Sequence, residues 1–169
     1  MKRLIILLMV ALVGVNVGYA QKLTARERKA QKEKEVTEWI ENRQFRFVAQ
    51  SVIPLAGPKI DLTSVYDLTV DSTWVESWLP FFGRAYHVDY GDTEGGIKFK
   101  EQAKSMEVRF NERKKTYQIN LEVDTPKDNY KIQISAGVGG YAHVDVLSNN
   151  RQSVGYYGII EALPEEDEK

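Results

Sequence analysis

The sequence contains no cysteine and only two histidines, His87 and His143, among its 169 residues. Without cysteine the chain has no disulfide, no thiolate nucleophile and no lipid attached through a thiol. Two histidines are too few for a histidine-rich zinc site. The motifs G-x-S-x-G, G-x-x-x-x-G-K-[ST] and H-E-x-x-H are also missing. We therefore expect binding rather than catalysis, with no metal and no other cofactor.

Most of the chain has neither an excess of one charge nor a long apolar run. The net charge of −1 argues against a nucleic-acid partner, because such proteins present a basic face. The exception is the apolar run 4–17, which follows two basic residues and precedes Gly18-Tyr19-Ala20. This pattern predicts a signal peptide over residues 1–20, and hence a periplasmic or secreted protein. A retained anchor is the alternative, although a spanning helix needs about 20 apolar residues.

A charged helix is predicted over residues 21–42. Thr24 and Glu27 have the spacing of a capping box at its start. The first half is charged all round, which is typical of a solvated arm, with a spacer or partner-binding helix as alternatives. Only the second half has an apolar patch that can dock, formed by Val36, Trp39 and Ile40.

After Asn42 the apolar period changes from helical to alternating, which indicates half-buried strands. The alternating segments are 45–50, 66–71, 73–79, 97–100, 106–110, 117–123, 130–134, 141–145 and 153–160. Short turns connect many of them, with Asn149-Asn150 as one example. No helical segment interrupts the strands, so parallel crossovers are not expected.

The predicted fold is therefore mainly β. We expect one antiparallel, up-and-down sheet of about nine strands over residues 43–162, curved into a barrel or folded as a sandwich. The N-terminal helix precedes the sheet. The acidic tail, residues 163–169, is expected to be disordered.

Six of the eighteen aromatic residues lie between Trp74 and Tyr90. In one interpretation, the strand 73–79 is covered on both faces and the apolar patch of the helix lies over its tryptophans. In the other, Trp74 and Trp78 stack against a carbohydrate while Glu76 bonds its hydroxyl groups. The clustering alone does not separate structure from binding.

The segment after Pro80 carries the second candidate site. Pro80 ends the strand, Gly83 permits a backbone conformation closed to other residues, and one of two adjacent phenylalanines is expected to enter the core. Arg84 either locks the loop through buried hydrogen bonds or receives an anionic ligand group at the lip of a pocket. The candidate ligand-binding residues are Trp74, Trp78, Phe81, Phe82, Gly83, Arg84, Tyr86, Tyr90, Tyr156 and Tyr157.

Two other polar clusters contain residue types that could carry chemistry. His143 shares strand parity with Tyr141 and Asp145, which predicts a histidine bonded on the outer face of the sheet, with a proton-transfer pair as the alternative. The acidic residues Asp89, Asp92 and Glu94 lie close to three glycines, do not match a calcium-loop pattern and indicate a glycine-rich polar turn.

The stretches "LPFFGRAY", "YGDTEGGIKF" and "NNRQSVGYYGII" resemble an uncharacterised secreted bacterial family, "domain of unknown function 4251". The resemblance covers nearly the whole chain. It implies export in Gram-negative, mostly gut-dwelling bacteria, and it supplies no catalytic residue and no established activity.

The function expected from the sequence is that of an exported binding or interaction module of the periplasm or cell envelope. Its ligand would be a small molecule, a glycan or an envelope protein. Two alternatives remain open. One is a small β-barrel carrier of an amphipathic ligand, with Arg84 and Tyr86 at its mouth. The other is a hydrolase with an unrecognised carboxylate site.

Overall fold

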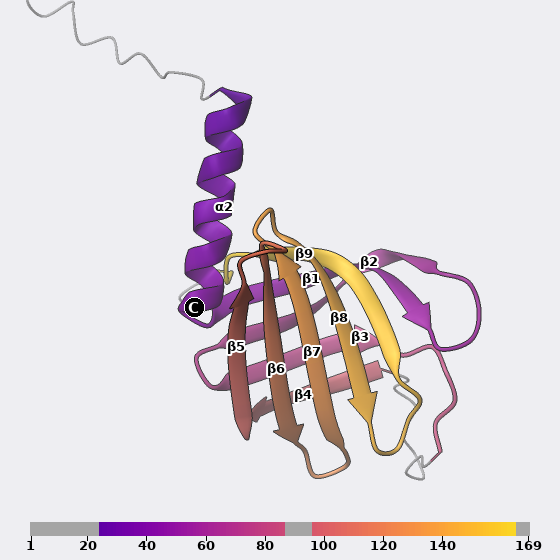
Figure 1. Cartoon of the computed structure of the whole chain (residues 1–169). Coiled ribbons are helices and arrows are strands. Elements are labelled where there is room, and N and C mark those ends of the chain that lie inside the picture. The colour runs from indigo at the N-terminus through magenta and orange to yellow at the C-terminus, as the bar shows by residue number, and fades with distance from the viewer. Residues whose placement is uncertain (1–23, 87–95, 165–169) are drawn as a thin grey trace, which may run out of the picture.

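The computed structural model describes residues 24–86 and 96–164, and in these ranges it contains one helix and nine strands (Figure 1). The helix is α2 (Ala25–Glu41), and the strands are β1 (Gln44–Pro54), β2 (Ile60–Asp71), β3 (Trp74–Pro80), β4 (Gly96–Gln102), β5 (Ser105–Asn111), β6 (Thr116–Asp124), β7 (Asn129–Gly137), β8 (Tyr141–Ser148) and β9 (Val154–Glu161). The predicted signal peptide, Tyr90, His87 and most of the acidic tail lie outside the described residues.

All nine strands belong to one antiparallel sheet in the order β4-β3-β2-β1-β9-β8-β7-β6-β5. Two meanders, β1–β4 and β5–β9, are joined where β1 pairs with β9. The sheet curls into a half-barrel, so that the two meanders form facing layers whose strands cross in Figure 1. The predicted fold class is confirmed, and the expected barrel or sandwich is an open, curled sheet with β4 and β5 at its edges.

The pairing of β1 is irregular where the two meanders join. The register of β1 shifts between Ala49 and Ser51 against both neighbours, which is the signature of a bulge that bends and twists a strand. On β9, a Cβ added at Gly158 would lie 2.8 Å from the Phe47 ring and closer still to the carbonyl oxygen of Val48. Glycine is needed there because the backbones approach closely.

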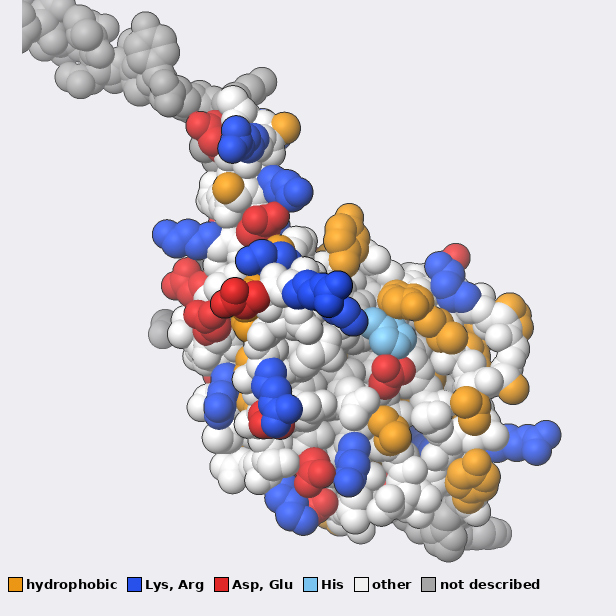
Figure 2. Space-filling model, in the orientation of Figure 1, with side chains coloured by type: hydrophobic (Ala, Val, Ile, Leu, Met, Phe, Trp, Pro, Cys, Tyr) orange, Lys and Arg blue, Asp and Glu red, His pale blue; other side chains and the backbone are white. Residues whose placement is uncertain are grey.

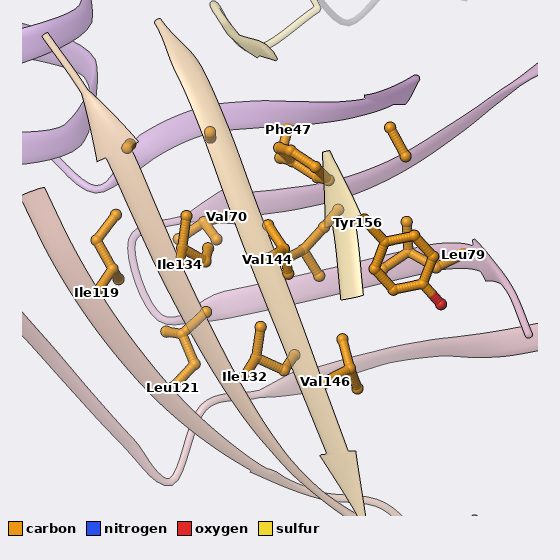
Figure 3. Packing of buried hydrophobic residues seen from close by; sticks show 14 of the residues in the cluster. Phe47, Val70, Leu79, Ile119, Leu121, Ile132, Ile134, Val144, Val146 and Tyr156 are labelled. Atoms are coloured by element: carbon orange, nitrogen blue, oxygen red, sulfur yellow. The ribbon is translucent and has the colours of Figure 1, made fainter. Parts of the chain in front are cut away.

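The inner face of the curled sheet forms the hydrophobic core (Figure 3). Alternate residues of both layers meet there, as the period of two requires. The largest fully buried side chains are those of Tyr156, Phe45, Phe47, Ile40, Leu68, Leu79, Ile97, Ile119, Leu121, Ile132, Ile134 and Ile160. Burial of this apolar surface offsets the conformational entropy of a chain that has no disulfide.

Helix α2 begins with the predicted capping box. The Thr24 backbone N–H donates to Glu27 Oε2 at 2.7 Å, and the Glu27 N–H donates to Thr24 Oγ1 at 3.3 Å. Only the C-terminal half of the helix docks, through the fully buried Val36 and Ile40, against β1, β9 and Gly140. The charged first half projects away from the sheet (Figure 1).

Candidate functional site

The outer face of β3 carries two of the three tryptophans. Because side chains alternate along a strand, Trp74, Glu76 and Trp78 point away from the core while Val75, Ser77 and Leu79 enter it. The exposed fractions of Trp74 and Trp78 are 47% and 57%. They are four positions apart on an extended strand, which corresponds to about 13 Å. We call Trp74, Glu76 and Trp78 the β3 platform.

The prediction that helix α2 covers these tryptophans is wrong. The apolar patch of the helix packs on β1 and β9, and β2 separates β1 from β3 in the sheet. Along its two edges β3 pairs with β2 and β4, but its outer face remains at the surface. The shared parity of Trp74 and Trp78 was therefore predicted correctly and their cover was not.

Charged residues surround the β3 platform and hold one another in place. Trp78 lies between Asp67 of β2 and Lys98 of β4, and the Lys98 Nζ atom is 4.9 Å from the centre of the indole ring. This is a cation–π contact. Asp67 accepts a hydrogen bond from Arg46 Nε at 2.6 Å, and Lys100 Nζ lies 2.9 Å from Glu76 Oε2. The platform thus combines apolar ring surface with positioned donors and acceptors.

The segment after β3 divides its aromatic residues between core and surface. Phe81 packs against the core, whereas Phe82 and Tyr86 are exposed. The expectation that one phenylalanine enters the core is confirmed. Gly83 does not have a positive φ, so the predicted unusual backbone conformation is wrong. A Cβ there would lie 3.0 Å from the Phe81 ring, and this close contact explains the glycine.

The arginine that locks this loop is Arg151 and not Arg84. Arg84 is exposed and interacts with the described chain through its backbone, since its N–H donates to Gln152 Oε1 and its carbonyl accepts from the Gln152 N–H, both at 3.1 Å. The Arg151 Nη1 atom donates to the Gly96 carbonyl at 2.9 Å, and its guanidinium lies 5.3 Å from the centre of the Phe81 ring. An isolated β-bridge pairs Ala85 with Arg151, and Arg84, the residue before Ala85, faces Gln152 instead.

Tyr156 and Tyr157 lie on opposite faces of β9. Tyr156 is completely buried, and its hydroxyl donates to the Pro80 carbonyl at 2.7 Å. Burial raises the pKa of its phenol above the ordinary value. Tyr156 is thus a core residue that fixes the end of β3, and its inclusion among ligand-contacting residues was wrong. Tyr157 is 49% exposed on the outer face.

The outer face beside Tyr157 also carries the predicted His143–Asp145 pair. His143 Nε2 lies 3.0 Å from Asp145 Oδ1, and the rings of His143 and Tyr157 are 4.6 Å apart. A Cβ at Gly155 would lie 3.1 Å from the imidazole, so this glycine makes room for it. Figure 2 shows hydrophobic, acidic and basic side chains mixed on this part of the molecular surface. A histidine bonded on the outer face was the favoured interpretation, and it is confirmed.

The structure brings only some of the candidates together. Trp74 and Trp78 share one face, and the loop 81–86 follows directly from their strand. Tyr157 lies three strands away from them in the sheet order. No role was predicted for Arg151 and Gln152, which hold the loop, although both lie in the stretch "NNRQSVGYYGII" that resembles the family.

Within residues 24–86 and 96–164, no three His, Asp or Glu side chains are placed to share a metal ion. In the same ranges no helix is both long and apolar enough to cross a membrane.

Comparison with known proteins gives a family and a fold. Residues 27–160 match the family described as "Domain of unknown function (DUF4251)". The chain is similar to the crystal structure of a DUF4251 family protein from Bacteroides eggerthii DSM 20697, with a TM-score of 0.62 and 14% sequence identity. That similarity covers 80% of this chain and 90% of the other, and at this identity it shows the fold alone. No curated protein matches the chain.

Proposed function

Since this chain belongs to the DUF4251 family, whose domain has no known function, we propose that it is an exported, non-enzymatic binding module that holds glycans on the β3 platform. One observation carries the proposal. Trp74 and Trp78 expose about half of their surface on the same face of a strand, with a carboxylate between them. Large apolar rings left in water beside polar groups mark a binding surface.

The chemistry of the platform suits a sugar chain. An indole ring offers a flat apolar face to the C–H face of a pyranose, while Glu76, Asp67 and Lys98 supply acceptors and donors for hydroxyl groups. The two tryptophans are about 13 Å apart, so an oligosaccharide covers both and a monosaccharide covers one. Binding should therefore strengthen with chain length.

The packed interior of the curled sheet favours a ligand bound on the surface over a ligand carried inside the sheet. Packed side chains from both layers fill the space between them, including Leu79, Val144 and Tyr156 (Figure 3). Arg84 and Tyr86, expected at the mouth of a carrier, are exposed beside this packed core. A ligand of the described domain is accommodated more readily on the outer face.

Export is the second part of the proposal and depends on the apolar run 4–17 with its preceding basic residues. A protein that folds without cysteine needs no oxidising compartment, so cysteine usage does not oppose either location. Cell fractionation of the native host and the mass of the processed chain test this part. Recovery of the unprocessed chain in the cytoplasm would contradict it.

Titration calorimetry with oligosaccharides tests the glycan site. The panel should include dietary β- and α-glucans, mucin-type glycans and peptidoglycan fragments, each at two or more chain lengths. We expect Trp78→Ala and Trp74→Ala each to weaken binding by about 10- to 30-fold, as is usual for a central aromatic contact. Because both rings lie outside the core, these variants should melt close to the wild type.

Tyr141→Ala is the matched control, because Tyr141 is an exposed aromatic residue of the outer face, 77% accessible, on the distant strand β8. It should bind like the wild type. The proposal fails if no glycan of the panel binds, or if one binds equally well to both tryptophan variants.

A further inference from the structure

The two edges of the sheet differ in their ability to accept another strand. In the described part of the chain β5 pairs with β6 on one side and with no strand on the other, and β4 pairs only with β3. An unpaired edge offers backbone N–H and C=O groups to a further strand. Whether a strand is accepted depends on the side chains that would face each other across the new pair.

The sequence of β5 is complementary to itself. If two copies of Ser105–Asn111 pair in antiparallel fashion with Val108 opposite Val108, Glu107 of each copy faces Arg109 of the other, and Met106 faces Phe110. Opposite charges and apolar pairs directly across two strands both stabilise a sheet. From this arrangement we propose that the protein forms a two-fold symmetric dimer, in which β5 of one copy pairs with β5 of the second.

The structure places these side chains where a second copy would meet them. Glu107 and Arg109 are exposed on the outer face, and Arg109 donates to Glu107 Oε1 within the chain, from Nη2 at 2.6 Å and from Nε at 3.0 Å. In a dimer the same two groups exchange partners and form two ion pairs across the axis. On the inner face Met106 and Val108 are half-buried and Phe110 is 40% exposed, so a second copy would extend a partly covered apolar row.

Among the registers with the longest overlap of the two strands, one satisfies both faces. A shift by one residue would exchange the inner and outer faces of the incoming strand. The two nearest registers that preserve the faces place Glu107 opposite Glu107, or Arg109 opposite Arg109, and like charges directly opposite are destabilising. The charges of β5 therefore select the symmetric pairing about Val108.

The other edge has the opposite character. The same symmetric pairing of β4 about Phe99 would place Lys98 opposite Lys100 of the second copy. Lysine on an edge strand is a common means of preventing sheet-to-sheet association. Because β4 carries this protection and β5 does not, we expect a closed dimer through β5 and no open chain of molecules.

Reciprocal charge reversal tests the dimer by sedimentation equilibrium of the full chain. Arg109→Glu and Glu107→Arg should each raise the dimer dissociation constant by about 10- to 100-fold, because two attractive pairs become repulsive. The two variants, mixed in equal amounts, should form a heterodimer, since each then faces the opposite charge. The double variant with both changes should dimerise like the wild type.

Arg113→Glu is the control, because it makes the same charge change at an exposed position of the turn beside β5. It should leave the dimer unchanged, and circular dichroism should show that every variant is folded. A wild type that stays monomeric at millimolar concentration overturns the proposal. So does a mixture of the two single variants that remains monomeric. Sugar binding plays no part in these measurements, so either proposal can fail alone.

Discussion

The two faces of this sheet use the same kinds of residue for opposite purposes. Tyr156 and Tyr157 follow one another on β9, yet the first is wholly buried and the second is half exposed. Likewise Leu79 and Trp78 are neighbours on β3, and only the leucine is in the core. Strand parity, and not the size or hydrophobicity of a side chain, decides which residues hold the fold and which meet solvent.

This difference separates stability from function. The inner face is packed by both layers, so a change of one methyl group there affects several neighbours. The outer face of β3 is bordered by charged pairs and can change its aromatic residues with little effect on the core. We therefore expect substitutions on the two faces to differ in kind, with the inner face altering the free energy of unfolding and the outer face altering binding.

The largest effect is expected at Gly158, where the two layers join. Gly158→Ala places a methyl group against the Val48 carbonyl and the Phe47 ring, and backbone must move to admit it. We expect a loss of about 3 kcal/mol or more in the free energy of unfolding, measured by urea denaturation followed by tryptophan fluorescence.

Gly139→Ala is the matched control, because a Cβ at Gly139 would have no atom within 4 Å. It should change the free energy of unfolding by less than about 1 kcal/mol. Equal effects of the two substitutions would mean that the close approach at the β1–β9 junction does not constrain the curl.

Local features of the fold could be predicted because they depend on local sequence. The alternation of apolar residues located all nine strands, the spacing of Thr24 and Glu27 located the capping box, and turn residues located several hairpins. The same alternation in β9 separates Tyr156 from Tyr157, so the error of placing both in one site was avoidable.

Long-range features could not be predicted in this way. The pairing of β1 with β9 joins residues one hundred or more positions apart, such as Pro54 and Val154, and no local period encodes it. The position of α2 over β1 and β9 follows from that pairing, which is why the tryptophans of β3 were wrongly given a cover. Arg151 is the bridge partner of Ala85 and Arg84 precedes Ala85, and local sequence does not show which of the two guanidinium groups lies toward the core.

A smaller effect should distinguish these two arginines. Arg151→Ala removes the donor to the Gly96 carbonyl and the cation above Phe81, so we expect a loss of about 1 to 3 kcal/mol. Arg84→Ala removes an exposed side chain and should change stability by less than about 0.5 kcal/mol. Thermal melting of both variants measures the two losses of stability and shows which arginine holds the loop. A larger loss from Arg84→Ala would restore the role first expected of that residue.

The smallest change in the free energy of unfolding is expected from removing the hydroxyl group of one of the two adjacent tyrosines. Tyr156→Phe leaves the Pro80 carbonyl without its donor and should lower the free energy of unfolding by about 0.5 to 1.5 kcal/mol at pH 7, whereas Tyr157→Phe should lower it by almost nothing.

The raised pKa of Tyr156 also makes the free energy of unfolding depend on pH. Above about pH 10, the ordinary pKa of tyrosine, the unfolded wild type loses this proton while the folded form retains it, so the wild type loses stability as pH rises. Phenylalanine cannot ionise, and the difference between wild type and Tyr156→Phe should shrink over that range. A constant difference from pH 8 to pH 11 would show that the Tyr156 hydroxyl reaches solvent and that the inner face is less closed than its packing indicates.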